Sequence, residues 1–373
     1  MTVKGLLVFV LLVAGAVHAA PAQSPFLGAN FNESLEWVDG DDLKRSHSQW
    51  ARGFIVYHHY KNGQRSLSSD PRIEGFKRLK AEGMNTILSL KFNFQQRPFP
   101  QTAAQIDEEL SLLPDLLDAL MPYADIVVAG NEPFIETDKS LRKAPLGAFY
   151  REVATRIHNY QQKHGFAQPL YLGAFNRLWE PRMKDDSAPL LALAKSLPWV
   201  AGIDLHIHHN TQEQFVTMID FALANIRDDQ RFIATEFSLM HHWKAAVQQT
   251  LPKKFAEQYG YPQNMKAYAY LDKVLNDAPV SRAEWVAFLR QSDWFESRKH
   301  YIRDAMQTFR QYPQFYGATY GLYQAYGNKP FTEDSTPWIL NSLFSNQTVT
   351  KQSGKPAFHY QFMRDYIAEQ EQK

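Results

Sequence analysis

The sequence of 373 residues contains no cysteine. The absence of thiols excludes disulfide bonds, thiolate metal sites and a cysteine nucleophile, so the core alone must stabilise the fold. An excess of charge of one sign is also lacking, because 40 basic and 39 acidic side chains leave a formal net charge of +1. This balance gives no electrostatic reason to expect binding to nucleic acid. No Gly-rich phosphate turn follows the first apolar segment, which argues against a dinucleotide-binding open sheet.

Long apolar runs are also scarce, and the first residues hold a short one. Residues 1–4 give a basic start, residues 5–17 are apolar, and Val17-His18-Ala19 places small residues where a signal peptidase cleaves. The apolar run is shorter than the roughly 20 residues that a membrane span needs. We therefore expect residues 1–19 to be a signal peptide, and the protein to be secreted or periplasmic without membrane insertion. An uncleaved membrane anchor is the alternative interpretation.

Short apolar segments alternate with amphipathic segments along the rest of the chain. The apolar segments predict strands at 26–30, 53–57, 86–90, 125–129, 170–174, 201–205, 232–235 and 315–320. Helical periodicity lies between them, as at 71–82, at 104–121 with a kink at Pro114, and at 146–164. Eight alternations of strand and helix favour an α/β fold, a single (β/α)8 TIM barrel over residues 24–373.

The segment between the last two expected strands is longer than one helix and its loops require. Residues 240–313 carry mostly helical patterns, so we expect a helical insertion in the barrel. Long loops after barrel strands usually shape the active site, and a lid or a wall of a cleft is one interpretation. A packing subdomain without a direct functional role is the other.

Polar and aromatic side chains gather at the carboxyl ends of the expected strands, where barrel enzymes place their active sites. Two glutamates stand out, because Glu132 ends the run that begins at Val127 and Glu236 ends the run that begins at Phe232. An unpaired buried carboxylate is costly, so such glutamates usually have a partner or a function. The other expected substrate contacts are Asn131, His206, His208, Lys91, Asn176, Trp243, Tyr320 and Tyr323.

This mixture of side chains suits a carbohydrate. Amides and imidazoles hydrogen-bond to hydroxyl groups, and aromatic rings offer flat apolar faces to sugar rings. A phosphorylated substrate would require more arginine. Two facing carboxylates are the minimum for glycoside hydrolysis, since one must hold a proton and the other must stay ionised against a developing positive charge.

At the two glutamates the sequence resembles the clan A retaining glycoside hydrolases, which are (β/α)8 barrels. Val127-Val128-Ala129-Gly130-Asn131-Glu132-Pro133 is similar to their strand-four signature, and Ile233-Ala234-Thr235-Glu236-Phe237 to their strand-seven signature. The resemblance implies that Glu132 is the general acid/base, that Glu236 is the nucleophile, and that Asn131 binds the hydroxyl next to the anomeric carbon. It implies double displacement on a poly- or oligosaccharide, no cofactor, and a bell-shaped pH profile whose alkaline limb reports Glu132.

The sequence departs from the clan pattern at two places. The clan often has His-x-Tyr after strand six, where this chain has His206-Ile207-His208. The aromatic residue after strand eight is commonly tryptophan, whereas the expected residues here are Tyr320 and Tyr323. These departures leave the two glutamates in place and leave the sugar and the linkage open.

Two other functions stay open. One is a barrel that binds glycan, or assists polysaccharide assembly, without cleaving it. The other is a metallohydrolase that uses His206 and His208, since alternate histidines on a strand point to one face. Barrel metallohydrolases usually place His-x-His on the first strand, which here ends Gly28-Ala29-Asn30, so we expect no metal site.

The tryptophans differ in their expected roles. Trp243 follows Glu236 closely and is the preferred platform for a sugar ring, whereas Trp37 and Trp179 follow the first and fifth strands and are weaker choices. Trp338 lies in the C-terminal tail, where we expect it to belong to the core.

Overall fold

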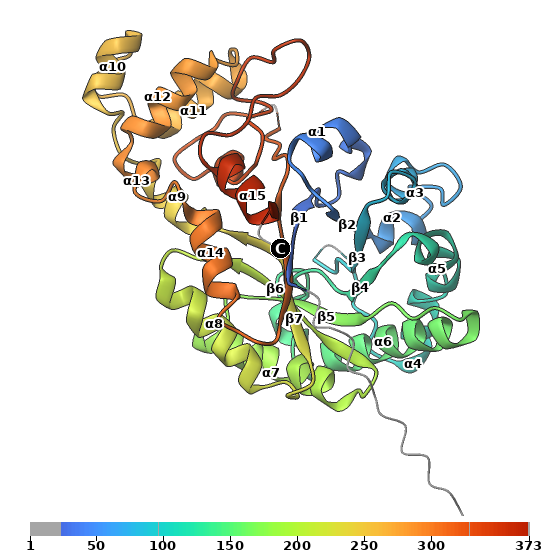
Figure 1. The fold of residues 1–373 in the computed structure, drawn as a ribbon. Coiled ribbons are helices and arrows are strands. Elements are labelled where there is room, and N and C mark those ends of the chain that lie inside the picture. Colours follow the sequence, from blue (N-terminus) through green and yellow to red (C-terminus); the bar gives the residue numbers. More distant parts are fainter. Residues whose placement is uncertain (1–23, 96, 328, 372–373) are drawn as a thin grey trace, which may run out of the picture.

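The computed structural model describes residues 24–95, 97–327 and 329–371. Eight parallel strands close into a barrel in chain order, and the last strand pairs with the first (Figure 1). The strands are β1 (Phe26–Asn30), β2 (Trp50–Val56), β3 (Asn85–Lys91), β4 (Ile126–Ala129), β5 (Leu170–Asn176), β6 (Val200–His208), β7 (Arg231–Ser238) and β8 (Phe315–Gly321). The prediction of a single (β/α)8 barrel is therefore confirmed. The expected signal peptide, residues 1–19, lies outside the described residues, and no helix within them is long and apolar enough to cross a membrane.

Helices follow most strands and cover the outside of the barrel. They are α1 (Gly40–Arg45), α2 (Tyr57–Lys61), α3 (Pro71–Ala81), α4 (Ala103–Glu109), α5 (Leu113–Leu120), α6 (Ala144–His164), α7 (Pro181–Ser196), α8 (Gln212–Ala224), α14 (Tyr301–Phe309) and α15 (Phe362–Glu371). Local capping explains several bounds. The Asp70 side chain accepts from the Arg72 N–H at the start of α3, and Gly165 ends α6 in a left-handed conformation.

Two expected element bounds were wrong. The helix expected over 104–121 is two helices, and Pro114 lies in the first turn of α5, where its missing N–H costs nothing. The second strand begins at Trp50 rather than at Gly53, because Arg52 is part of the strand and is fully buried. A charged residue inside an apolar run concealed the first half of this strand.

The interior of the barrel has an apolar floor below a polar layer. Trp50, Ile87, Ile126, Val128 and Ile233 cluster inside the barrel, separate from the larger core between the strands and the helices. Alternate residues of β4 divide between these two cores, as the period of a strand requires. The apolar floor closes the barrel, so any chemistry belongs to the layer above it.

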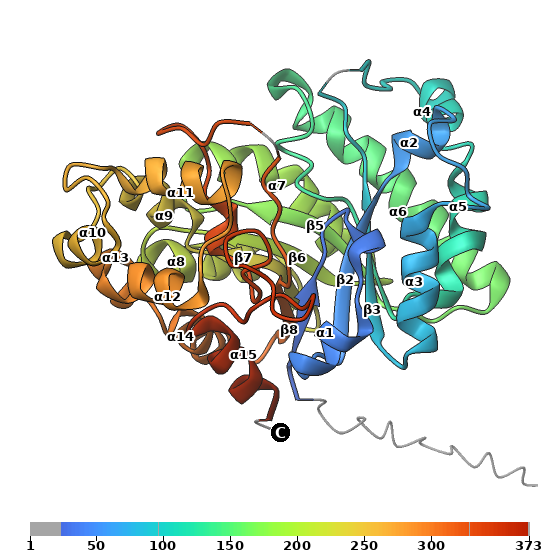
Figure 2. The ribbon, with the colours of Figure 1, turned by 90° about the horizontal axis from the view of Figure 1, so that it is seen from above.

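The segment between β7 and β8 contains α9 (Met240–Ala246), α10 (Lys253–Tyr259), α11 (Ala267–Asn276), α12 (Arg282–Gln291) and α13 (Asp293–Glu296) before α14. Aromatic side chains give it a small core of its own, in which the rings of Tyr270 and Phe288 lie 4.6 Å apart. Figures 1 and 2 both show α10, α11 and α12 to one side of the barrel.

The burial of Trp243 on α9 yields a prediction about stability. Its side chain is fully buried, and its indole N–H donates to Asn341 Oδ1 over 2.9 Å. We expect Trp243→Ala to lower the free energy of unfolding by ~3–5 kcal/mol, measured by urea denaturation. Trp37→Ala is the matched control, because Trp37 is 46% exposed, and we expect it to change this free energy by less than ~0.5 kcal/mol. Equal effects of the two substitutions would contradict the assignment.

Candidate functional site

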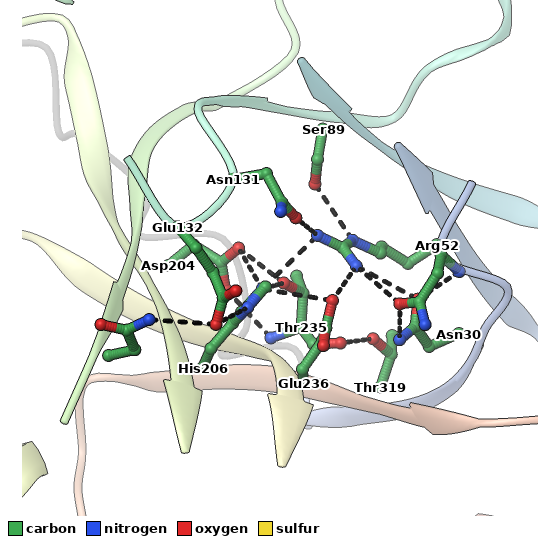
Figure 3. Close-up of polar contacts among 12 residues, drawn as sticks. Asn30, Arg52, Ser89, Asn131, Glu132, Asp204, His206, Thr235, Glu236 and Thr319 are labelled. Atoms are coloured by element: carbon green, nitrogen blue, oxygen red, sulfur yellow. Dashed lines mark hydrogen bonds and ion pairs between the residues drawn. The ribbon is translucent and has the colours of Figure 1, made fainter. Parts of the chain in front are cut away.

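The polar layer lies at the carboxyl ends of the strands, and strand register brings its members together. Arg52 on β2 lies opposite Asn30 on β1, and His206 on β6 lies opposite both Asn176 on β5 and Glu236 on β7. Figure 3 shows the side chains of Asn30, Arg52, Glu132, His206 and Glu236 pointing toward one another. The structure therefore brings Glu132, Asn131, Asn176, His206, His208 and Glu236 together, as the sequence predicted.

A sharp turn after β4 aims Glu132. Gly130 has φ +118°, and a Cβ atom there would lie 1.8 Å from the Gly173 carbonyl oxygen, so only glycine fits. Glu132 itself has φ +48°, a left-handed conformation that few residues other than glycine adopt. Its carboxylate accepts from Asn176 Nδ2 over 3.0 Å. The turn thus holds Glu132 in a backbone conformation that a free chain would rarely adopt.

Arg52 connects the two glutamate-bearing strands, and the sequence analysis missed it. Its guanidinium is fully buried and donates to Glu236 Oε1 over 2.6 Å and to Asn131 Oδ1 over 2.7 Å. It also donates to Ser89 Oγ over 3.1 Å and to Asn30 Oδ1 over 3.2 Å. Such a fork fixes the planes of both acceptors at once. The signal in the sequence was a single arginine in the apolar run Trp50–Val56.

One imidazole lies between the two glutamates. His206 Nδ1 is 3.4 Å from Glu132 Oε1, and Nε2 is 3.7 Å from Glu236 Oε1. These are ion-pair distances, and the shortest hydrogen-bond contact of the ring is from Nε2 to Thr235 Oγ1 at 3.1 Å. Burial acts to lower the pKa of His206, but Glu236 and Glu132 outweigh burial and raise that pKa above its ordinary value of 6.5.

The cationic groups reverse the effect of burial on both carboxyls. Burial alone would raise the pKa of Glu132, but the charged His206 beside it lowers that pKa to about 2. Burial also opposes ionisation of Glu236, yet His206, His208 and Arg52 together hold its pKa well below its usual range. A general acid normally has a raised pKa, so the expectation that Glu132 titrates on the alkaline side does not agree with the free protein.

Asn131 and Lys91 are held by a second buried acid that the sequence analysis did not single out. Glu136 lies one turn after Glu132, and its Oε1 accepts from Asn131 Nδ2 over 3.1 Å. Lys91 Nζ pairs with the same oxygen over 2.9 Å. Asn131 is therefore oriented by Arg52 on its oxygen and by Glu136 on its nitrogen. The ammonium group of Lys91, expected to contact substrate, is already paired with a buried carboxylate.

The aromatic residues are arranged differently from expectation. Trp243 and Tyr320 are fully buried and offer no face to a ligand, so their expected contacts with substrate are wrong. Thr319 donates its hydroxyl to the Thr235 carbonyl, and alternation along β8 then turns Tyr320 outward against Phe237, at 5.1 Å between ring centroids. The phenol of Tyr323 is only partly buried and donates to Asp42.

Trp338, rather than Trp243 or Tyr320, is the aromatic residue that lies against His208. It lies in a short 3-10 helix (Trp338–Leu340), is only partly buried, and meets the His208 ring edge-on at 5.0 Å. His208 in turn bonds Ser238 Oγ through Nδ1 over 2.8 Å and lies 3.5 Å from Glu236 Oε2 through Nε2. The expectation that Trp338 belongs to the core was therefore wrong, because the C-terminal tail returns to the mouth of the barrel.

Glu132, His206 and His208 are also the side chains best placed to hold a metal ion. One donor atom from each lies within 4.8 Å of the others. Two imidazoles and a carboxylate suit Zn²⁺ or a similar cation. The guanidinium of Arg52, 3.4 Å from His206 Nε2, and the raised pKa of His206 both oppose a second cation here. The charges of the site thus favour the metal-free interpretation.

The Arg52–Glu236 pair gives a testable energy. We expect Arg52→Met to lower the free energy of unfolding by ~3–5 kcal/mol, because it leaves the Glu236 charge buried without its partner. Adding Glu236→Gln removes that charge, so the double variant should be more stable than the sum of the two single losses predicts. Urea denaturation of the four proteins at pH 7 measures the coupling. Strictly additive losses would contradict the pairing.

Comparison with known proteins supports the fold. No family model and no curated protein matches the sequence. Among solved structures, a GH10 endoxylanase retrieved from a sugarcane soil metagenome superposes with a TM-score of 0.54 at 12% identity, over 92% of this chain and 97% of that chain. The endo-β-1,6-glucanase BT3312 superposes with a TM-score of 0.52 at 10% identity, over 93% and 76%. At such identities the likeness concerns the fold alone, and that fold is the closed eight-stranded (β/α)8 barrel.

Proposed function

We propose that this protein is a secreted retaining glycoside hydrolase that cleaves O-glycosidic bonds of a poly- or oligosaccharide. One observation carries the proposal: two glutamates, one just after β4 and one on β7 of the barrel, both lie within 4 Å of a single buried imidazole. Glu236 attacks the anomeric carbon and forms a glycosyl-enzyme, and Glu132 assists the leaving group and then activates water. The basic and apolar start of the sequence supports secretion.

The charges around Glu236 suit a nucleophile. Its lowered pKa, caused by His206, His208 and Arg52, favours the ionised carboxylate that a nucleophile requires. Arg52 holds one carboxylate oxygen at 2.6 Å, so the carboxylate cannot rotate freely. A fixed, ionised oxygen close to the anomeric carbon lowers the entropy cost of the attack.

The proton for the leaving group is stored on His206 in this proposal. Glu132 is ionised in the free protein, and the imidazolium lies 3.4 Å away. As Glu236 forms its bond to the sugar, its negative charge is consumed, and the main cause of the raised pKa of His206 disappears. The proton then passes from His206 Nδ1 to Glu132 Oε1 and on to the departing oxygen. Water then attacks the anomeric carbon, and the bond between the sugar and Glu236 breaks. The proton that this water loses passes to Glu132 and restores the proton shared with His206.

Asn131 is suited to bind the hydroxyl next to the anomeric carbon. Its oxygen is occupied by Arg52 and one amide hydrogen by Glu136, which leaves the second amide hydrogen to donate to the substrate. Because both partners are buried and hold the amide by hydrogen bonds, the amide is oriented before the sugar binds. Trp338, beside His208, offers a ring to the same sugar unit.

Release of new reducing ends tests the proposal. We expect the wild type to act on at least one of xylan, β-1,4-mannan and the mixed or β-1,6-linked glucans. Glu236→Gln should lose at least ~10³-fold in rate, and the exposed control Glu213→Gln should lose nothing. EDTA should not change the rate. Loss of activity with EDTA would instead support a metallohydrolase at Glu132, His206 and His208.

A second function has one observation in its favour. The lowered pKa of Glu132 suits an anionic binding group better than a free-standing general acid. A barrel that binds glycan without cleaving it would bind members of the same panel and release no reducing ends from them.

The pH dependence separates His206 from Glu132 as the proton source. Since the pKa of His206 is raised above 6.5, the imidazolium predominates at pH 6.5 and below, and it is lost as the pH rises through the higher folded value. We expect kcat/KM to fall on the alkaline side at a pH above 6.5. His206→Gln should move this limb, whereas His241→Gln, on α9, should leave it in place. A limb that does not move in His206→Gln would contradict the stored proton.

A further inference from the structure

Trp37 is an unusual residue on the surface. Within the described part of the chain it is the one large hydrophobic side chain that is exposed, with 46% of its area accessible. It lies in a short 3-10 helix (Leu35–Trp37) just after β1, at the mouth of the barrel. A single exposed ring needs no explanation by itself, so its surroundings decide what it means.

Two hollows adjoin this ring on either side. The inner one, of about 230 Å³, is lined by Asn32, Phe54, Trp37 and Tyr323, and the outer one, of about 380 Å³, by Trp37, Tyr323 and Asn346 among others. Both hollows are lined by Trp37 and Tyr323, so they are neighbours, and we call the two together the Trp37 groove. Each hollow is many times larger than the ~30 Å³ that a water molecule occupies, so the groove has room for more than ordered solvent.

The inner end of the groove reaches the glutamates. Asn32 Oδ1 accepts from Asn30 Nδ2 over 2.7 Å and from Arg52 Nη1 over 3.4 Å. The same Arg52 nitrogen donates to Glu236 Oε1 over 2.6 Å. Arg52 therefore links the groove residue Asn32 to the proposed nucleophile through two hydrogen bonds, which places the inner hollow one side chain away from Glu236.

The lining indicates which class of molecule the groove takes. Trp37 supplies a flat apolar face, and Asn32 and Asn346 supply amides that can donate and accept. Carboxylates at Glu33 and Asp39 line the walls, which disfavours a polyanion such as nucleic acid. Tyr323 is already oriented, because its hydroxyl donates to Asp42. A ring platform with oriented hydrogen-bonding groups around it matches a pyranose.

We propose that the Trp37 groove binds sugar units of the glycan chain whose scissile bond lies at Glu236, on the side of that bond away from Glu132. The direction rests on the proposed function, because Glu132 follows β4 and faces the leaving group. The groove lies over β1, β2 and β8, and β8 stands opposite β4 in the closed order of strands. The units in the groove thus belong to the part of the substrate that Glu236 retains in the glycosyl-enzyme.

Binding tests the groove without requiring turnover. Affinity electrophoresis of the Glu236→Gln protein, in gels containing soluble xylan, galactomannan, barley β-glucan or β-1,6-glucan, measures retardation by each glycan. We expect retardation by at least one, and a ~10-fold weaker apparent affinity after Trp37→Ala is added, or ~1.4 kcal/mol. Trp199→Ala is the matched control and should leave the affinity unchanged, because this partly buried tryptophan stacks on His158 just before β6, at the opposite end of the barrel. No retardation by any glycan, or retardation that Trp37→Ala leaves unchanged, would overturn the proposal.

Substrate length tests the direction. For the glycan that is retarded, nitrophenyl glycosides of one to four sugar units keep the leaving group constant while the retained part grows. We expect kcat/KM to rise with length in the wild type, and Trp37→Ala to remove ~10-fold from the longest substrate and nothing from the shortest. An equal loss at every length would contradict the direction. Binding that depends on Trp37 without turnover would defeat the proposed hydrolase and leave the groove in place.

Discussion

The guanidinium of Arg52 is buried inside a closed barrel, and its charge must be balanced there by hydrogen-bond acceptors. An unpaired charge in such an interior costs several kcal/mol, so the surrounding side chains must be acceptors. Glu236, Asn131, Asn30 and Ser89 meet that requirement from four other strands or their ends. The positions of the proposed nucleophile and of the amide that binds the sugar are therefore set by the same buried cation.

The second constraint is the balance of charge around His206. The ring lies near two carboxylates, and Asp204 lies below it at 3.8 Å from Nε2. A neutral imidazole would leave the carboxylates to repel each other, so a proton on His206 stabilises both. The site therefore contains a proton whose location depends on the charge of Glu236. Consumption of that charge is the event that the proposed mechanism uses to release the proton.

Much of the fold follows from patterns that the chain shows locally. Most strands are apolar runs that end at a polar residue or a glycine, or just before one, and Glu132 and Glu236 were placed at strand ends because each closes such a run. Arg52 was missed because a charged residue within an apolar run normally marks a loop. Arg52 can lie inside β2 because its buried guanidinium is paired with Glu236. Trp338 was missed because the path of the tail back to the barrel mouth is tertiary information. Tyr320 was misplaced although alternation with Thr319 on β8 contained the answer.

The central claim is that Glu236 becomes covalently attached to the sugar. Incubation with a 2-deoxy-2-fluoro glycoside of the sugar that the enzyme cleaves, carrying an activated leaving group, slows hydrolysis of the intermediate enough for mass spectrometry of the digested protein. The account predicts a single added glycosyl group on the peptide that contains Glu236, and none after Glu236→Gln. A wild type that releases the activated group without any adduct on that peptide, or with an adduct on Glu132, would contradict it.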